Sequence, residues 1–137
     1  LQREREAVER RLSLQSAEGL LSLARQVDGV TVLATRATAA TADSLREVGD
    51  WLRDKLGSGI VVLGSVINDR PMLVAMVTPD LVERGLDAAE IARGAARAIG
   101  GGGGGRADVA QAGGRDADNL DDALGLVPDL VREKIGS

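Results

Sequence analysis

The spacing of hydrophobic and polar residues along the chain predicts both strands and helices. Three runs consist mainly of apolar and β-branched residues, at Val30–Thr35, Ile60–Ile67 and Met72–Val77. Runs of this kind are typical of buried strands, so the sequence predicts a sheet whose two faces are covered by helices. Turn-forming residues at Asn68–Pro71 separate the last two runs and predict a β-hairpin. A further short strand is predicted at Asp108–Ala112.

Other segments carry hydrophobic residues three or four positions apart, which predicts helices. The predicted helices span residues 41–56, 79–84, 87–99 and 120–135. Thr41, Asp43 and Ser44 are alternative N-caps of the first. Gly125 and Pro128 interrupt the last, so we expect a kink or two short helices there. The fold class predicted for residues 29–137 is therefore a single α/β domain with a mixed β-sheet flanked by helices.

Residues 1–28 are rich in charge and carry only a narrow apolar stripe. We expect a helical arm here, and the stripe needs a partner. Three partners remain open: the body of the domain, another chain through a coiled coil or dimer contact, or a preceding part of the same chain. Because the sequence begins at Leu1 and not at Met, we also expect it to be a piece of a longer protein.

Composition excludes several kinds of chemistry. The 137 residues include no Cys and no His, which excludes disulfides, Cys or His zinc sites, and mechanisms that use a His base or Cys nucleophile. No pair of carboxylates lies on an apolar background that would tune it for acid–base catalysis. No apolar run reaches the ~20 residues of a membrane span, and no signal peptide is present, so we expect a soluble, cytoplasmic protein without a membrane partner.

A block of six glycines, Gly100–Gly105, is the most unusual feature of the sequence. An alanine-rich helical pattern precedes it and the apolar segment Val109–Ala112 follows it, so we expect an ordered loop with a functional or packing role and not a flexible linker. The block lacks the Lys and Ser or Thr of a nucleotide P-loop. A glycine loop of this kind can present successive N–H groups as an anion-binding nest.

The formal net charge of −4 counts against a nucleic-acid partner, but the charge is unevenly distributed. No acidic residue lies between Glu90 and Asp108, whereas this window holds Arg93, Arg97 and Arg106, and Arg115 follows shortly afterwards. The one basic stretch of the chain therefore coincides with the glycine block.

Two residues beside the glycines have more than one interpretation. Arg106 either clamps a phosphate or forms a structural ion pair with Asp108 or Asp116. Gln111 either reads the edge of a base or satisfies carbonyl groups of the loop. The sequence leaves both alternatives open.

The segment GGGGGGRADVAQAGG at residues 100–114 closely resembles the signature of the C-terminal domain of alanyl-tRNA synthetases. That domain is related to the one that accompanies the catalytic unit of DHH phosphoesterases. The resemblance extends over nearly the whole chain, through VTVLATR, LREVGDWLRDKLGSGIVVLGSV and MLVAMVTPDLVERGLDAAEIARGAARAIGG. The phosphoesterases typically carry a His after the glycines, where this sequence has Arg106, and this favours the synthetase branch.

The resemblance implies a non-catalytic module that has no cofactor of its own. The parent enzyme joins alanine to tRNA(Ala) with ATP and magnesium, and clears mischarged tRNA at a zinc-dependent editing site. Its C-terminal domain contacts the tRNA elbow, links aminoacylation to editing, and in some members forms a homodimer. The RNA contacts expected here are Arg93, Arg97, Gly100, Gly101, Gly102, Gly103, Gly104, Gly105, Arg106, Gln111 and Arg115. Two alternatives stay open: a dimerisation module with little RNA affinity, or a nucleic-acid-gripping domain of a DHH phosphoesterase.

Overall fold

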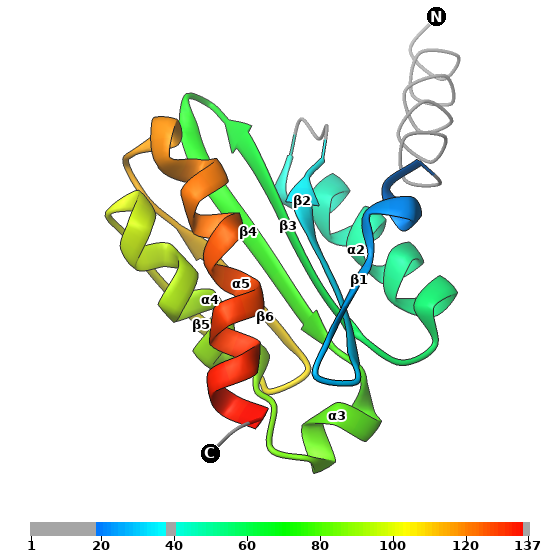
Figure 1. Cartoon of the computed structure of the whole chain (residues 1–137). Helices are drawn as coiled ribbons and strands as arrows, with labels where there is room; N and C mark the ends of the chain where they lie inside the picture. The colour runs from blue at the N-terminus through cyan, green and yellow to red at the C-terminus, as the bar shows by residue number, and fades with distance from the viewer. Residues whose placement is uncertain (1–18, 38–40, 136–137) are drawn as a thin grey trace, which may run out of the picture.

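The computed structural model describes residues 19–37 and 41–135, which form one mixed sheet with helices on both sides (Figure 1). The strand order is β1-β2-β3-β4-β6-β5, and only the β2–β3 pair among these is parallel. The strands are β1 (Arg25–Val27), β2 (Val30–Arg36), β3 (Ile60–Ile67), β4 (Arg70–Val77), β5 (Gly102–Gly105) and β6 (Val109–Gly113). The predicted α/β fold with a mixed sheet is confirmed.

The helices are α2 (Ala42–Leu56), α3 (Pro79–Glu83), α4 (Ala88–Ala96) and α5 (Leu120–Ile135), with short 3₁₀ turns η1 (Leu21–Leu23), η2 (Arg97–Ile99) and η3 (Ala117–Asn119). Of the alternative caps of α2, Thr41 is the one that acts, because its hydroxyl accepts a hydrogen bond from the Ser44 N–H at 3.1 Å. The α5 helix continues through Pro128, so the expectation of two short helices is wrong. Buried side chains on both sides of the proline, such as Leu124 and Val131, hold α5 against the sheet.

Tight turns set the register of two hairpins. Asn68 and Asp69 have φ of 53° and 65° between β3 and β4, and Asp28 and Gly29 have φ of 49° and 85° between β1 and β2. Consecutive positive φ values match the turn type that suits the twist of antiparallel strands. The first hairpin confirms the prediction. The second hairpin was not predicted. Residues 25–27 form a strand, so the predicted helical arm does not reach Asp28. Residues 1–18 of that arm lie outside the described residues.

Helices cover the two faces of the sheet unequally. On one face, which we call the α2 face, α2 packs on β3 and β4 and buries Leu33, Leu45 and Leu63 completely. On the other face, α4 packs on β4, β5 and β6, and α5 packs on β2 and β3. The α4 contacts are made by small residues such as Ala92 and Ala95, which allow the helix to approach closely. This unequal cover leaves part of the sheet open.

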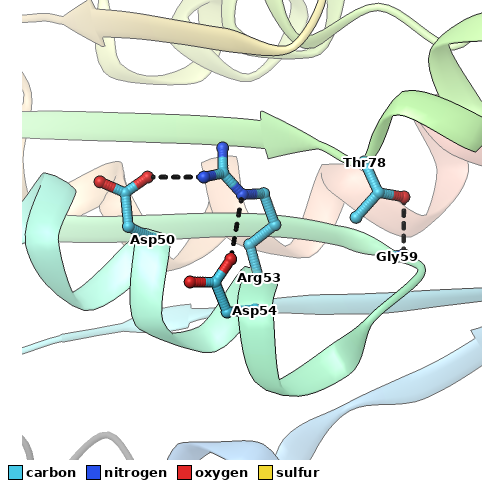
Figure 2. Close-up of polar contacts among 5 residues, drawn as sticks. All are labelled: Asp50, Arg53, Asp54, Gly59 and Thr78. Atoms are coloured by element: carbon cyan, nitrogen blue, oxygen red, sulfur yellow. Dashed lines mark hydrogen bonds and ion pairs between the residues drawn. The ribbon is translucent and has the colours of Figure 1, made fainter.

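Polar contacts join β3 to β4 and lie along the surface of α2 (Figure 2). The buried hydroxyl of Thr78 accepts a hydrogen bond from the Gly59 N–H at 3.1 Å and so joins the start of β3 to the end of β4. On α2, the Arg53 guanidinium lies 3.1 Å from an Asp50 oxygen and 4.0 Å from an Asp54 oxygen. These three side chains are on the helix surface, where such pairs contribute little to stability.

Candidate nucleic-acid interface

The glycine block is a strand and not the loop that the sequence predicts. Gly102–Gly105 forms β5 at the edge of the sheet and pairs antiparallel with β6, from Gly102 opposite Gly113 to Gly105 opposite Ala110. In an extended strand, successive N–H groups point in opposite directions, so this run does not form the predicted nest. The short strand predicted at Asp108–Ala112 is confirmed as β6.

Five glycines of the block, Gly101–Gly105, fall into two groups with different surroundings. A Cβ atom placed on Gly101, Gly103 or Gly105 would collide with main-chain atoms of β6 or of Gly114, so glycine is required there. A Cβ atom on Gly102 or Gly104 would meet nothing within 4 Å. Neither of these two residues has a positive φ. The fold therefore does not require glycine at positions 102 and 104.

Register places Gly102, Gly104 and Gln111 on the α2 face of the sheet. Gly104 is opposite Gln111 on β6, and Gln111 is in turn opposite Val74, which packs beneath α2. However, α2 covers β3 and β4, whereas β5 and β6 pack against α4 on the other face. Among the helices that the structure describes, none covers this part of the α2 face. We call it the open β5–β6 surface, which consists of Gly102, Gly104, Val109, Gln111 and Gly113.

Gln111 is half-buried on this surface, and its amide makes no hydrogen bond to the side chain or main chain of another described residue. Its neighbours on β5 are glycines, which offer no side chain to bond. Of the two interpretations of Gln111, the satisfaction of loop carbonyls is therefore not observed. Within the described chain, both the donor and the acceptor of this amide are therefore available at the surface.

The predicted arginines surround β5. Main-chain hydrogen bonds hold α4 alongside this strand, from Ala88 N to Ala107 O (2.8 Å) at one end to Gly101 N to Ala96 O (3.0 Å) at the other. Arg97 in η2 precedes the strand, and Arg115 is near the same end because its N–H donates to Ile99 O at 2.8 Å. Arg106 follows the other end and Arg93 lies on α4 between them.

All four of these arginine side chains are exposed, and none forms an ion pair with an acid in the described part of the chain. The structural tie between Arg106 and Asp108 or Asp116 is thus not observed. The carboxylate of Asp116 instead lies beside Gly100, where a Cβ atom would be 2.7 Å from its Oδ2. Arginines therefore lie near both ends of β5, with Asp116 beside the first end and Asp108 in the turn that follows the second.

The described residues were also searched for a metal site, for a perturbed carboxylate and for a membrane-spanning helix. In residues 19–37 and 41–135, no group of three or more acidic, Cys or His side chains is placed to hold a metal ion. The pKa of Asp80 is lowered, mainly because the Ser58 hydroxyl donates a hydrogen bond to its carboxylate. Asp80 lies in the first turn of α3. No helix of the described chain is long and apolar enough to cross a membrane.

Comparison with known proteins identifies the family of this chain. The profile of the DHHA1 domain matches residues 29–133, and the chain belongs to the DHHA1 domain family. Within known sequences, an alanine–tRNA ligase from Dehalococcoides mccartyi (strain CBDB1) is 48% identical over 124 residues, which are 90% of this chain and 14% of that protein. The chain is therefore homologous to one segment of the ligase and spans about 14% of its length.

Two solved structures share the fold. The C-Ala domain of the Aquifex aeolicus alanyl-tRNA synthetase has a TM-score of 0.68 and 27% identity, and the match covers 80% of this chain and 97% of that one. A DHH-domain protein described as a member of the s1p family of ribosomal proteins has a TM-score of 0.55 at 11% identity, over 90% of this chain and 31% of that one, which shows the fold alone. The resemblance to the C-terminal domain of alanyl-tRNA synthetases is thus confirmed.

Proposed function

We propose that this domain is a non-catalytic RNA-binding module of an alanyl-tRNA synthetase. It binds the elbow of tRNA(Ala) and so links aminoacylation to editing within its parent. Homology to the C-terminal domain supports the assignment to the synthetase. ATP, magnesium and zinc belong to other parts of the parent enzyme, and this domain uses no cofactor of its own. The parent acts in the cytoplasm.

One observation carries the proposal of RNA binding. Four exposed arginines, which have no acidic partner within residues 19–37 and 41–135, lie near a strand that has no side chains, so phosphate groups can approach both the cations and the main chain. Arginine is well suited to phosphate because its guanidinium donates several hydrogen bonds in a fixed plane. Recognition of this type reads the shape and backbone of a folded RNA and not its base sequence.

The test is a titration of the chain against folded tRNA(Ala) and against an unfolded RNA of equal length, at low and at physiological salt. We expect tighter binding to folded tRNA, and affinity that falls steeply with salt because bound phosphates release counterions. The variant with Arg93, Arg97 and Arg106 changed to Gln should bind at least about 10-fold more weakly and show a shallower salt dependence, by up to ~0.9 per lost phosphate contact.

A matched control changes the same number of arginines elsewhere. Arg25, Arg46 and Arg84 are exposed on β1, α2 and the end of α3. Their change to Gln gives the same net charge as the test variant, so it separates local contacts from overall charge. Equal losses in the two variants would contradict binding at β5. A stable dimer in sedimentation, together with no RNA binding, would favour the dimerisation alternative, and a preference for single strands would favour the phosphoesterase alternative.

A further inference from the structure

A groove lies between α5 and the β1–β2 edge of the sheet, on the face opposite α2. Its volume is about 380 Å³, which is within the range of sites that bind small ligands. Its apolar lining includes Val32, Ala34, Leu124 and Pro128, and Arg25 of β1 lies beside them. None of the predicted RNA contacts lines the groove, and β1 and β5 are opposite edges of the sheet. The groove is therefore separate from the candidate nucleic-acid interface.

The sequence of α5 opens this groove at two positions. Gly125 is exposed within the helix and lines the groove, and a Cβ atom there would meet nothing within 4 Å. Pro128 has no N–H, so the Leu124 carbonyl lacks the hydrogen bond that a helix supplies from four residues later. No described residue outside α5 donates to this carbonyl. Because Leu124 and Pro128 both line the groove, an acceptor without its usual donor lies beside it.

Charge limits what can occupy the groove. Arg36 Nε lies 2.5 Å from Asp121 Oδ1, so this guanidinium and this carboxylate neutralise each other. Arg25 also lines the groove and has no ion pair with a described residue. The lining therefore has one uncompensated positive charge, which a ligand with a single negative charge matches. A free amino acid would also bring an ammonium group, for which no unpaired acid of the lining remains.

We propose that this groove binds the C-terminus of a peptide whose last residue is apolar. The terminal carboxylate binds the Arg25 guanidinium, whose planar set of donors suits a carboxylate. The last amide N–H donates to the Leu124 carbonyl, and the last side chain packs on Val32 and Ala34. The domain thus has a protein-binding site in addition to the proposed RNA contacts, and neither site depends on the other.

The experiment titrates the isotopically labelled 137-residue chain with the peptide acetyl-Ala-Ala-Leu and follows the amide signals of the chain by NMR. We expect shifts in β1, β2 and α5, with a dissociation constant of about 0.1–1 mM for a ligand of this size. The same peptide with a C-terminal carboxamide keeps the side chain and the N–H groups but has no charge. It should bind about 10-fold more weakly. Free leucine, which has an ammonium group in place of the amide, should also bind more weakly.

Arg25→Gln should remove the preference for the carboxylate and leave the affinity for the carboxamide unchanged. Arg84→Gln is the matched control, because Arg84 is exposed at the end of α3 and does not line the groove. This control should retain the preference.

Gly125→Leu places a side chain at the groove and should weaken binding of both peptides about 10-fold or more. Its melting temperature should not fall, because leucine favours a helix more than glycine does and the new Cβ meets no atom of the fold. If this variant melts early, Gly125→Ala is the second variant and should weaken both peptides to a smaller extent.

Equal affinities of the wild-type chain for the carboxylate and the carboxamide would overturn this inference, as would unchanged binding by the folded Gly125 variants. Tighter binding of free leucine than of the peptide, or shifts confined to other elements, would overturn it as well. None of these results bears on RNA affinity, which is measured separately. A chain that binds no RNA would overturn the proposed function and leave the peptide site standing.

Discussion

Two alanine substitutions in neighbouring glycines should have opposite effects on stability. In Gly103→Ala, the new Cβ would lie 2.5 Å from the Ala112 Cβ and 2.6 Å from its Cα, closer than carbon atoms can approach. These atoms belong to β6, which is held between β4 and β5 and whose Ala112 is buried. The strain cannot be relieved by a side-chain rotation, so β5 must move away from β6. Overpacking of this kind costs about 2–3 kcal/mol.

In Gly104→Ala, the added methyl group meets no atom within 4 Å and the φ value is allowed. The loss of backbone freedom in the unfolded chain should stabilise the protein by roughly 0.5–1 kcal/mol. The two variants should therefore differ by about 3 kcal/mol, or about 10 °C in melting temperature for a domain of this size. Urea unfolding followed by circular dichroism measures the difference. Equal stability of the two variants would refute the assignment of β5 and its register.

Three further changes test the rest of the fold. Leu63→Ala, at a fully buried position on β3, should destabilise the domain by about 2–5 kcal/mol in the same unfolding assay. Thr41→Ala removes the side-chain cap from the Ser44 N–H and should cost about 1 kcal/mol, whereas Thr41→Asn should restore most of it. The pKa of Asp80 is lowered from 3.8 by the Ser58 hydroxyl, so its contribution to stability is present above pH 3.8 and is lost as the pH falls towards the lowered value. Ser58→Ala should therefore make the free energy of unfolding less sensitive to acid in that range, which unfolding at several pH values would measure. Titration of the Asp80 carboxyl followed by NMR would give its pKa directly, and an unchanged pKa in the variant would contradict the role of Ser58.

The central part of the fold could be predicted because its signals are local. The apolar runs of β3 and β4 and the turn between them are contiguous, and α2 has its cap and its buried face within residues 41–56. β1 was not predictable from hydrophobic spacing, because it has only three residues, two of them exposed, and depends on the turn at Asp28 and Gly29. β5 was still less accessible, since a run of glycines has no strand propensity and only its pairing with β6 makes it extended.

The candidate site shows why residue type alone was not enough. In the sequence, Gly102 and Gly103 are indistinguishable, and both were expected to serve one loop. Successive residues of a strand point to opposite faces of the sheet. Once β5 pairs with β6, neighbouring glycines therefore have different surroundings. The glycines at 101, 103 and 105 let two strands approach each other, whereas those at 102 and 104 leave a surface open. Binding studies on the block should therefore change Gly102 and Gly104, because a change at position 101, 103 or 105 alters the strand pairing and any loss of affinity would follow from the damaged fold.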